Sequence, residues 1–385
     1  MPAAKAASSI FVFMCIRFGG TFLGSIVVVP FHARAERSVS QPSPVAHALA
    51  TPLFARGSYL HPMSSSTKRI ASFLIMAYAI SWSIVGIGVA LGTGPSQPLG
   101  YMLMAGLSMF GPALAAIIQQ RLLDRAPWSG LGIHLKGVHW RQVAWTAVIG
   151  LSIIPLALLV AMGLGDGLGI EAFGHVSITQ ERLLTSIGEM MDGSGVKSNA
   201  LATVLEGHHL PGALLLVGLA LVTLLVACTV NLPVMMGEEL GWRGYLFQAT
   251  QHWSGARRVL FTGVVWGLWH APLIAMGHNY PEHPIAGIGL MVVFCTLLAL
   301  QFDRARLRSG TTWAAGLLHG CINGSAGGYV LFAWGGGSLV NSPVGLAGFI
   351  AIVLLGIAVL AFDRTYRNRF LMPTTDPVTV PPIGD

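Results

Sequence analysis

The chain has 385 residues, of which 54% are hydrophobic and only 10% are charged, and its mean hydropathy is +0.68. This composition excludes a water-soluble globular protein, in which about 25% of the residues are charged, and it predicts an all-α, polytopic membrane protein that forms one helical bundle. The formal net charge of +7 comes from Lys and Arg in short clusters between apolar segments, a pattern typical of topology signals that gives no support to a nucleic-acid partner.

Residues 1–62 form an N-terminal extension that has three interpretations. Residues 10–31 are apolar but interrupted by Arg17, and a polar stretch rich in Pro, Ser and Ala follows. The segment is either a signal peptide with a poor Ala-x-Ala cleavage site at 33–35, or a ninth span, or non-native sequence ahead of a true start at Met63. We favour the third, because Met63 leads directly into a clean apolar segment with basic residues before it, and we assign no function upstream of it.

Eight apolar stretches are long enough to cross a bilayer, which takes about 20 consecutive apolar residues in a helix. They predict transmembrane helices over residues 70–92, 100–120, 142–164, 212–237, 258–277, 284–302, 311–333 and 343–362. The chain from Met63 onward therefore divides into N-terminal helices with an outer loop (63–211), a central region (212–333), and a last helix with a cytoplasmic tail (334–385).

Basic residues mark every second connection between these stretches. They precede the first stretch, separate the second from the third and the fourth from the fifth, precede the seventh and follow the eighth. Because Lys and Arg are enriched in cytoplasmic loops, we expect both chain ends on the cytoplasmic side of the plasma membrane. The uncharged connections 93–99 and 334–342 and the acidic loop 165–211 belong outside, and residues 178–191 of that loop predict a short amphipathic helix.

The first ionisable group within an apolar stretch is Gly-Glu-Glu-Leu-Gly-Trp-Arg at 237–243. An ionisable side chain at the bilayer centre costs about 2.5–3.5 kcal/mol on insertion scales, so such residues are functional candidates by default. Glu239 and Arg243 are four residues apart in the favourable order for a helical ion pair, which leaves Glu238 without an assigned partner. A poorly solvated, unpaired carboxylate is a candidate general base. The alternative is a polar network that merely ends a helix.

Two later stretches each carry a polar or aromatic pair whose members are four residues apart and so share one helical face. Trp266 could wall a pocket beside His270, whose imidazole can accept or deliver a proton. His319 and Asn323 can both donate hydrogen bonds, and two fixed donors aimed at one point stabilise an oxyanion. Taken singly, each pair also has a structural interpretation as interhelical hydrogen bonding.

The expected depths of these residues favour a single site. With a rise of about 1.5 Å per residue, Glu238, His270 and His319 lie about 12–18 Å from the cytoplasmic ends of their helices. One water-filled cavity could therefore hold all three, and one site is a simpler explanation than three separate coincidences.

The order Glu-Glu-x-x-x-Arg, aromatic-x-x-x-His and His-x-x-x-Asn, each on a separate apolar helix, resembles the CPBP family of CAAX proteases and bacteriocin-processing enzymes, also called the Abi or type II CAAX prenyl endopeptidase family. The resemblance covers residues 212–333 and rests on Glu238, Glu239, Arg243, Trp266, His270, His319 and Asn323. It implies an eight-helix intramembrane glutamate endopeptidase.

The resemblance also implies roles for these residues. Glu238 and His270 would activate water, and His319 and Asn323 would support the oxyanion. The remaining three would be supporting residues, and they are Glu239, Arg243 and Trp266. The last of them stands where Phe is the commoner aromatic residue of the family.

The same resemblance implies the bilayer and a peptide or protein as partners, the latter prenylated in CAAX-type members and a leader peptide or bacteriocin in others. We expect no cofactor, because the chain has no H-E-x-x-H or C-x-x-C sequence and Glu and His can hold a water without a Lewis acid. Some members have been described as metalloproteases, so zinc held by Glu238, His270 and His319 is the alternative.

Two functions of other classes compete with proteolysis. A proton-coupled transporter also places Glu, His and Arg inside spans, but the two halves of the sequence show no matching pair of Gly- or Pro-broken segments. A catalytically inert immunity or scaffold protein is the other rival, and it would tolerate the loss of Glu238.

Overall fold

The computed structural model describes residues 66–192 and 210–372, so the interpretations of residues 1–62 lie outside the described residues. Within those ranges the strands are limited to one antiparallel pair, β1 (His175–Val176) with β2 (Ala333–Trp334), and nearly everything else is helix or short connection. The predicted all-α class is confirmed.

The helices follow one another along the chain with few long connections. They are α2 (Ser66–Ala90), α3 (Pro98–Ser108), α4 (Gly111–Ile117), α5 (Trp140–Met162), α6 (Gln180–Asp192), α8 (Gly212–Val226), α9 (Leu232–Glu239), α10 (Phe247–Thr250), α11 (Gly255–Trp269), α12 (Ala271–Ala275), α13 (Pro284–Ser309), α14 (Thr312–Phe332), α15 (Leu346–Phe362) and α16 (Arg364–Leu371). The π-helical turns are η1 (Ile118–Leu123), η3 (Gly163–Gly167), η5 (Ala227–Asn231) and η6 (Leu240–Leu246), and the 3-10 turns are η2 (Trp128–Leu131) and η4 (Glu171–Phe173). The short helix predicted in the outer loop is confirmed as α6.

Five helical stretches are long and apolar enough to cross a membrane. They are Ser66–Ala90, Pro98–Leu123, Trp140–Gly167, Gly212–Thr250 and Pro284–Ser309, and they correspond to five of the eight predicted spans. α15 and α16 pass the same test only as a pair bent by 102°, which would make six. The predicted number of about eight is therefore not confirmed in the part of the chain that the structure describes.

The two remaining predicted spans do not pass this test, and both carry polar residues of the candidate site. The span predicted at 258–277 is broken at His270 into α11, of 15 residues, and the short α12, because Pro272 cannot donate the next hydrogen bond of the α11 ladder. α14 is one helix of 21 residues, but its glycines together with His319 and Asn323 lower its hydropathy. Of the three helical stretches that carry candidate site residues, Gly212–Thr250 passes the test and the other two do not.

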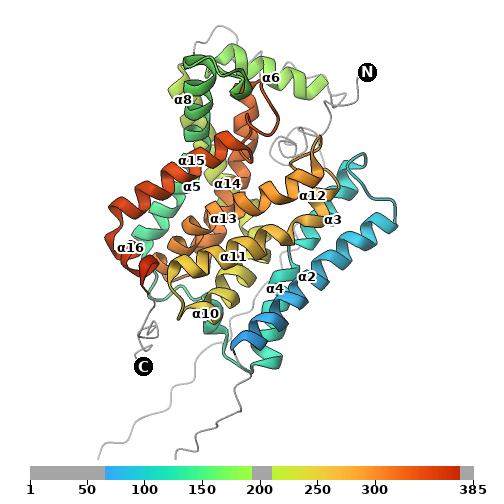
Figure 1. Ribbon diagram of the computed structural model, residues 1–385, viewed down its shortest axis with the longest axis vertical. Helices are drawn as coiled ribbons and strands as arrows, with labels where there is room; N and C mark the ends of the chain where they lie inside the picture. Colours follow the sequence, from blue (N-terminus) through green and yellow to red (C-terminus); the bar gives the residue numbers. More distant parts are fainter. Residues whose placement is uncertain (1–65, 193–209, 373–385) are drawn as a thin grey trace, which may run out of the picture.

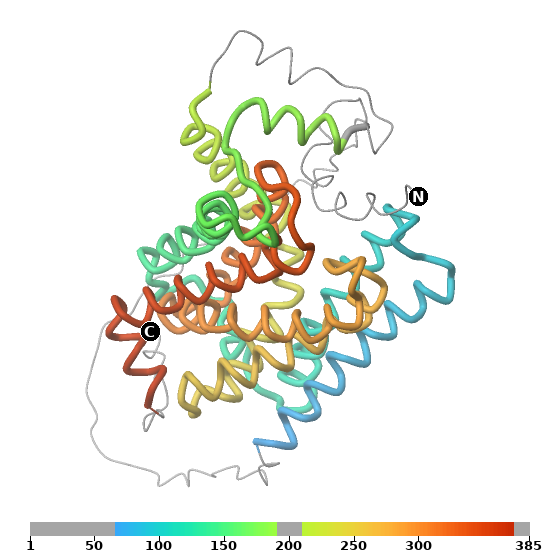
Figure 2. Tube along the Cα trace, turned by 45° about the horizontal axis from the view of Figure 1, so that its top comes forward, coloured from blue at the N-terminus to red at the C-terminus, as the bar shows by residue number. Residues whose placement is uncertain are grey.

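Close backbone contacts hold the central helices together. α11 and α13 run side by side (Figure 1), with more contacts than any other pair, and α14 packs against α5, α8 and α9. Gly263 and Gly267 permit the first approach, since a Cβ at Gly267 would lie 2.4 Å from the Cα of Val292. Small residues at helix interfaces are typical of membrane bundles. In both views α2 runs along one edge of the bundle, and α15 and α16 lie on the opposite side (Figure 1, Figure 2).

Candidate active site

The two neighbouring glutamates lie in a buried, irregular helix. Glu238 and Glu239 are the last residues of α9, which is flanked by the π-helical turns η5 and η6. Such turns are rare and occur frequently at functional sites. Glu238 is 2% exposed and Glu239 is fully buried, so each needs a specific partner to remain stable there.

Glu239 is held by a cation and by an imidazole. Arg243 donates from Nη1 to both carboxylate oxygens, at 3.1 Å each, so the ion pair predicted from the four-residue spacing is confirmed. His319 places Nδ1 2.8 Å from Glu239 Oε1. A carboxylate that accepts these bonds requires a proton on Nδ1, which leaves Nε2 as the other functional nitrogen of the ring.

Glu238 has a partner that the sequence did not suggest. Trp266, itself 2% exposed, donates its indole Nε1–H to Glu238 Oε2 at 2.8 Å. The expectation of an unpaired carboxylate is therefore corrected, because a neutral donor from another helix satisfies one oxygen. The other oxygen, Oε1, has no hydrogen-bond partner among the described residues. A Phe at position 266 would supply an aromatic wall but no donor.

His270 is fixed in orientation by the helix that it ends. Its Nδ1 lies 2.8 Å from the backbone carbonyl oxygen of Trp266, and a carbonyl only accepts, so Nδ1 carries the proton and Nε2 presents a lone pair. The ring lies against two indoles, with centroids 5.8 Å from Trp266 and 4.8 Å from Trp269. Cys295 of α13 approaches the same ring, with Sγ 3.9 Å from Nδ1.

Trp266 brings most of the candidates together. Besides its bonds to Glu238 and His270, its ring centroid is 5.6 Å from that of His319 and 4.3 Å from Cζ of Arg243. Since Arg243 holds Glu239, six of the seven residues singled out in the sequence form one contiguous cluster built from α9, η6, α11 and α14.

Asn323 stands apart from this cluster in its hydrogen bonding. It lies one turn beyond His319 on α14, half-buried, and donates from Nδ2 to Met235 Sδ at 3.4 Å. In this arrangement Asn323 and His319 donate to separate acceptors, although the sequence suggested two donors aimed at one point. The physical reason is that the Glu239 carboxylate is a stronger acceptor for His319 than a neutral group.

Two buried side chains of this region were not foreseen. Phe302 of α13 lies 4.0 Å from Cζ of Arg243, on whose guanidinium Trp266 also stacks, and its ring is 5.6 Å from that of His319. Cys295 is the second. Neither residue type is unusual in an apolar helix, so the sequence offers no local signal for them.

A zinc site is the alternative that the sequence leaves open for Glu238, His270 and His319. Among the described residues, no group of three or more His, Cys, Asp and Glu side chains is placed so that it could hold a metal ion. If these residues held a metal, they would do so through Glu238 Oε1 and the Nε2 atoms of His270 and His319, because Glu238 Oε2 and both Nδ1 atoms already have hydrogen-bond partners.

Comparison with known proteins adds to this geometry. Residues 213–325, which include all seven candidates, match the family model described as type II CAAX prenyl endopeptidase Rce1-like. CAAX prenyl protease 2 of Methanococcus maripaludis is 46% identical over 44 residues, or 11% of this chain and 16% of that protein. The alignment thus spans less than a fifth of the length of the curated relative.

Proposed function

We propose that this chain, whose residues 213–325 match the Rce1-like CAAX endopeptidase family, is an intramembrane endopeptidase that hydrolyses a peptide bond with water activated by Glu238 and His270. The observation that carries the proposal is the position of Trp266, which contacts Glu238, His270, His319 and Arg243 inside an apolar bundle.

The proposed reaction begins with a water molecule held between Glu238 and His270. Neither Glu238 Oε1 nor His270 Nε2 has a hydrogen-bond partner in the part of the chain that the structure describes, so together they can orient the water and Glu238 can take its proton. The water oxygen attacks the carbonyl carbon of the substrate and forms a tetrahedral oxyanion. The proton then passes to the amide nitrogen, the C–N bond breaks, and a carboxylate and an amine leave.

The oxyanion needs hydrogen-bond donors, and the third motif can supply them. Asn323 has a weak acceptor in Met235, so its amide can turn toward a stronger one. His319, whose Nδ1 is held by the Glu239 carboxylate, presents Nε2 as the ring nitrogen that can face the oxyanion. Donors preorganised in a water-poor site contribute far more than they do in water.

The substrate is proposed from the family as a membrane-associated protein or leader peptide, with prenylated CAAX-type proteins as the first class to test. The five to six candidate spans support a site that receives its substrate from the bilayer. We propose that no metal takes part in hydrolysis, and that the protein lies in the plasma membrane.

The test compares peptide termini in membranes from cells that express wild type or Glu238→Gln at matched levels. Gln keeps the shape and can still accept from Trp266, but it cannot take a proton, so we expect hydrolysis to fall by at least about 10²–10⁴-fold. Glu189→Gln is the matched control, since that side chain is 64% exposed on α6. Termini unique to wild type and the control would support a protease and identify its substrates. Equal termini in all three membranes would favour a carrier or an inert membrane protein.

A further inference from the structure

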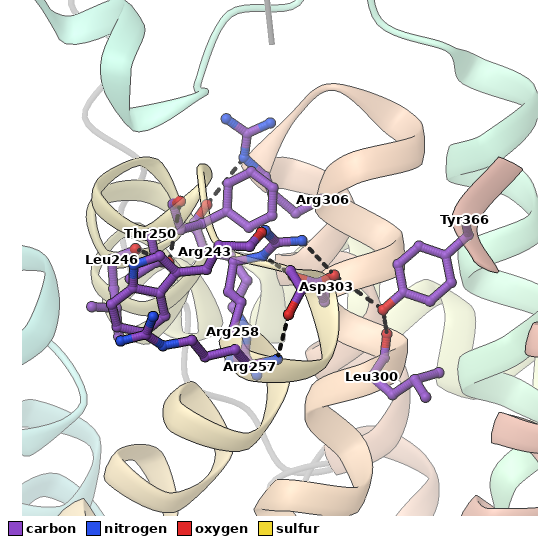
Figure 3. Close-up of polar contacts among 12 residues, drawn as sticks. Arg243, Leu246, Thr250, Arg257, Arg258, Leu300, Asp303, Arg306 and Tyr366 are labelled. Atoms are coloured by element: carbon purple, nitrogen blue, oxygen red, sulfur yellow. Dashed lines mark hydrogen bonds and ion pairs between the residues drawn. The ribbon is translucent and has the colours of Figure 1, made fainter. Parts of the chain in front are cut away.

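A second buried polar network lies beside the candidate active site, outside the seven residues that the proposed reaction uses. Arg258 of α11 donates from Nε and Nη2 to the two carboxylate oxygens of Asp303 on α13, at 2.5 and 2.9 Å. Tyr366 of α16 donates its hydroxyl to Asp303 Oδ2 at 3.0 Å (Figure 3). All three residues are almost fully buried. We call Arg258, Asp303 and Tyr366 the Asp303 network.

A small cavity separates this network from Arg243. It has a volume of about 10 Å³, and Trp242, Arg243, Arg258, Thr262 and Asp303 are among the residues that line it. That is about the space needed for one water molecule. Two donors on lining residues, Nη2 of Arg243 and Nε1 of Trp242, are buried and have no hydrogen-bond partner among the described residues. Leaving such donors unpaired destabilises the folded protein. A strong acceptor is close by, because Asp303 lines the same cavity.

We propose that one buried water in this cavity accepts hydrogen bonds from Arg243 and Trp242 and donates to Asp303, which makes Asp303 a positioning residue for Arg243. Arg243 then has both arms fixed: Nη1 holds Glu239, and Nη2 is held through the water. Because Glu239 orients His319, the Asp303 network reaches the proposed oxyanion site without touching a substrate.

The main chain around Arg243 supports the same assignment. Arg306, one turn after Asp303 on α13, donates from Nε to the backbone carbonyl of Arg243 at 3.0 Å. Thus α13 secures the residue at its backbone, and the water would secure it at its guanidinium. Tyr366 brings α16 into this arrangement, so the last described helix becomes part of the support of the active site.

The first test does not depend on activity. An experimental structure of the purified full chain should show an ordered water within hydrogen-bond distance of Arg243 Nη2, Trp242 Nε1 and Asp303. A map that resolves other buried waters but shows none here, or shows Arg243 bonded directly to Asp303, would overturn the proposal.

The second test rests on the proposed function and uses Tyr366→Phe, which removes only the hydroxyl, whose partners are Asp303 Oδ2 and the backbone carbonyl of Leu300. We expect kcat to fall by about fivefold, the effect of one hydrogen bond, with KM unchanged because no group that touches substrate is altered. Asp363→Asn is the matched control. Asp363 ties α16 to Arg304 and Arg308 but does not line the cavity, so its loss should leave kcat within twofold of wild type.

The two results separate the possible failures. Equal losses of kcat in Tyr366→Phe and Asp363→Asn would show that α16 acts only as a clamp, and unchanged kcat in Tyr366→Phe would show that the network does not reach Arg243. Either result contradicts the proposal. If wild type cleaves nothing, the proposed function fails, and the map of the cavity alone decides whether the water is present.

Discussion

Trp266 donates its indole N–H to Glu238, 28 residues away in sequence, while its backbone carbonyl accepts from His270 one turn further along. The same side chain stacks on the guanidinium of Arg243. Trp266 therefore fixes both groups that we propose to activate water. Its backbone carbonyl holds His270, and its indole N–H, which a phenyl ring lacks, holds Glu238.

We predict that Trp266→Phe lowers kcat by about 10-fold or more, because a hydrogen bond to a charged group contributes about 1.5–3 kcal/mol. The phenyl ring keeps most of the packing, so the protein should still fold. Trp269→Phe is the control: its Nε1 is buried without a hydrogen-bond partner among the described residues, and its replacement removes no hydrogen bond. Peptide cleavage by the two purified variants measures the difference. Equal rates in both would show that the indole N–H of Trp266 has no role in turnover.

These contacts also show where a sequence is informative about a site. The Glu239–Arg243 pair could be predicted because four residues of helix bring both side chains to one face. The bond between Trp266 and Glu238 could not, because it depends on how α9 and α11 pack. Likewise His319 and Asn323 share a helical face, as their spacing predicts. Their acceptors, Glu239 and Met235, lie on the neighbouring helix α9, so the sequence of α14 alone could not identify them.

At the scale of the helix, the contact between α11 and α13 positions His270 relative to the rest of the site. Gly267 lies one turn before His270 and almost touches the backbone of α13, since an added Cβ would be 2.4 Å from Val292 Cα. Backbone atoms cannot give way as a flexible side chain can. The close packing of this pair therefore depends on the missing side chain.

We predict that Gly267→Ala lowers the free energy of unfolding by about 1–3 kcal/mol, the usual cost of overpacking. Gly289→Ala on α13 is the matched control, because an added Cβ there meets nothing within 4 Å, and Ala is the better helix former. Thermal unfolding in detergent would compare them. A Gly267→Ala protein as stable as the Gly289→Ala protein would mean that the two helices can separate without cost.

Hydropathy predicted the long helices well, including the stretch that carries Glu238, and its predicted spans were not confirmed at α11 and α14. α2, α5 and α13 stand out because their apolar runs are uninterrupted. The break of α11 at His270 depends on Pro272, whose effect on a helix varies with its surroundings. The mean hydropathy of α14 is lowered by the same glycines and polar residues that bring this helix close to α9. The hydropathy pattern therefore predicts which segments enter the bilayer. Whether a segment forms one unbroken helix depends on how it packs.

The contact between His278 and Tyr101 should make the free energy of unfolding depend on pH. Outside the candidate spans, His278 follows α12 and lies 3.0 Å from Tyr101 Oη through Nδ1, and burial lowers the pKa of His278 from 6.5 to about 4. Between these values the unfolded chain binds a proton that the folded chain does not, so the free energy of unfolding falls as the pH is lowered through this window and is constant above it.

We predict that His278→Gln flattens this dependence, whereas His252→Gln, at an exposed position, leaves it as in wild type. The midpoint of thermal unfolding, measured in detergent across the window, checks both variants. A His278→Gln protein that loses stability on acidification as steeply as wild type would place the responsible group elsewhere.

For the whole molecule, the distribution of charge predicts which end of the bundle faces each side of the membrane. α16 carries Arg364, Arg367 and Arg369, and it lies toward the end of the bundle where α10 is found, whereas α6 is at the other end (Figure 1). Lys and Arg near the ends of spans favour the cytoplasmic side. The α16 end should therefore face the cytoplasm, and the loop after β2 should face outward.

We predict that a membrane-impermeant maleimide labels Gly337→Cys in intact cells and labels Asn368→Cys only after the cells are permeabilised. Both positions are exposed, and both variants are made in a background without the native cysteines, because Cys228 is exposed. We expect this labelling pattern because the opposite orientation would require the Arg residues of α16 to cross the bilayer, which is costly. Labelling of Asn368→Cys in intact cells, with Gly337→Cys protected, would reverse the topology.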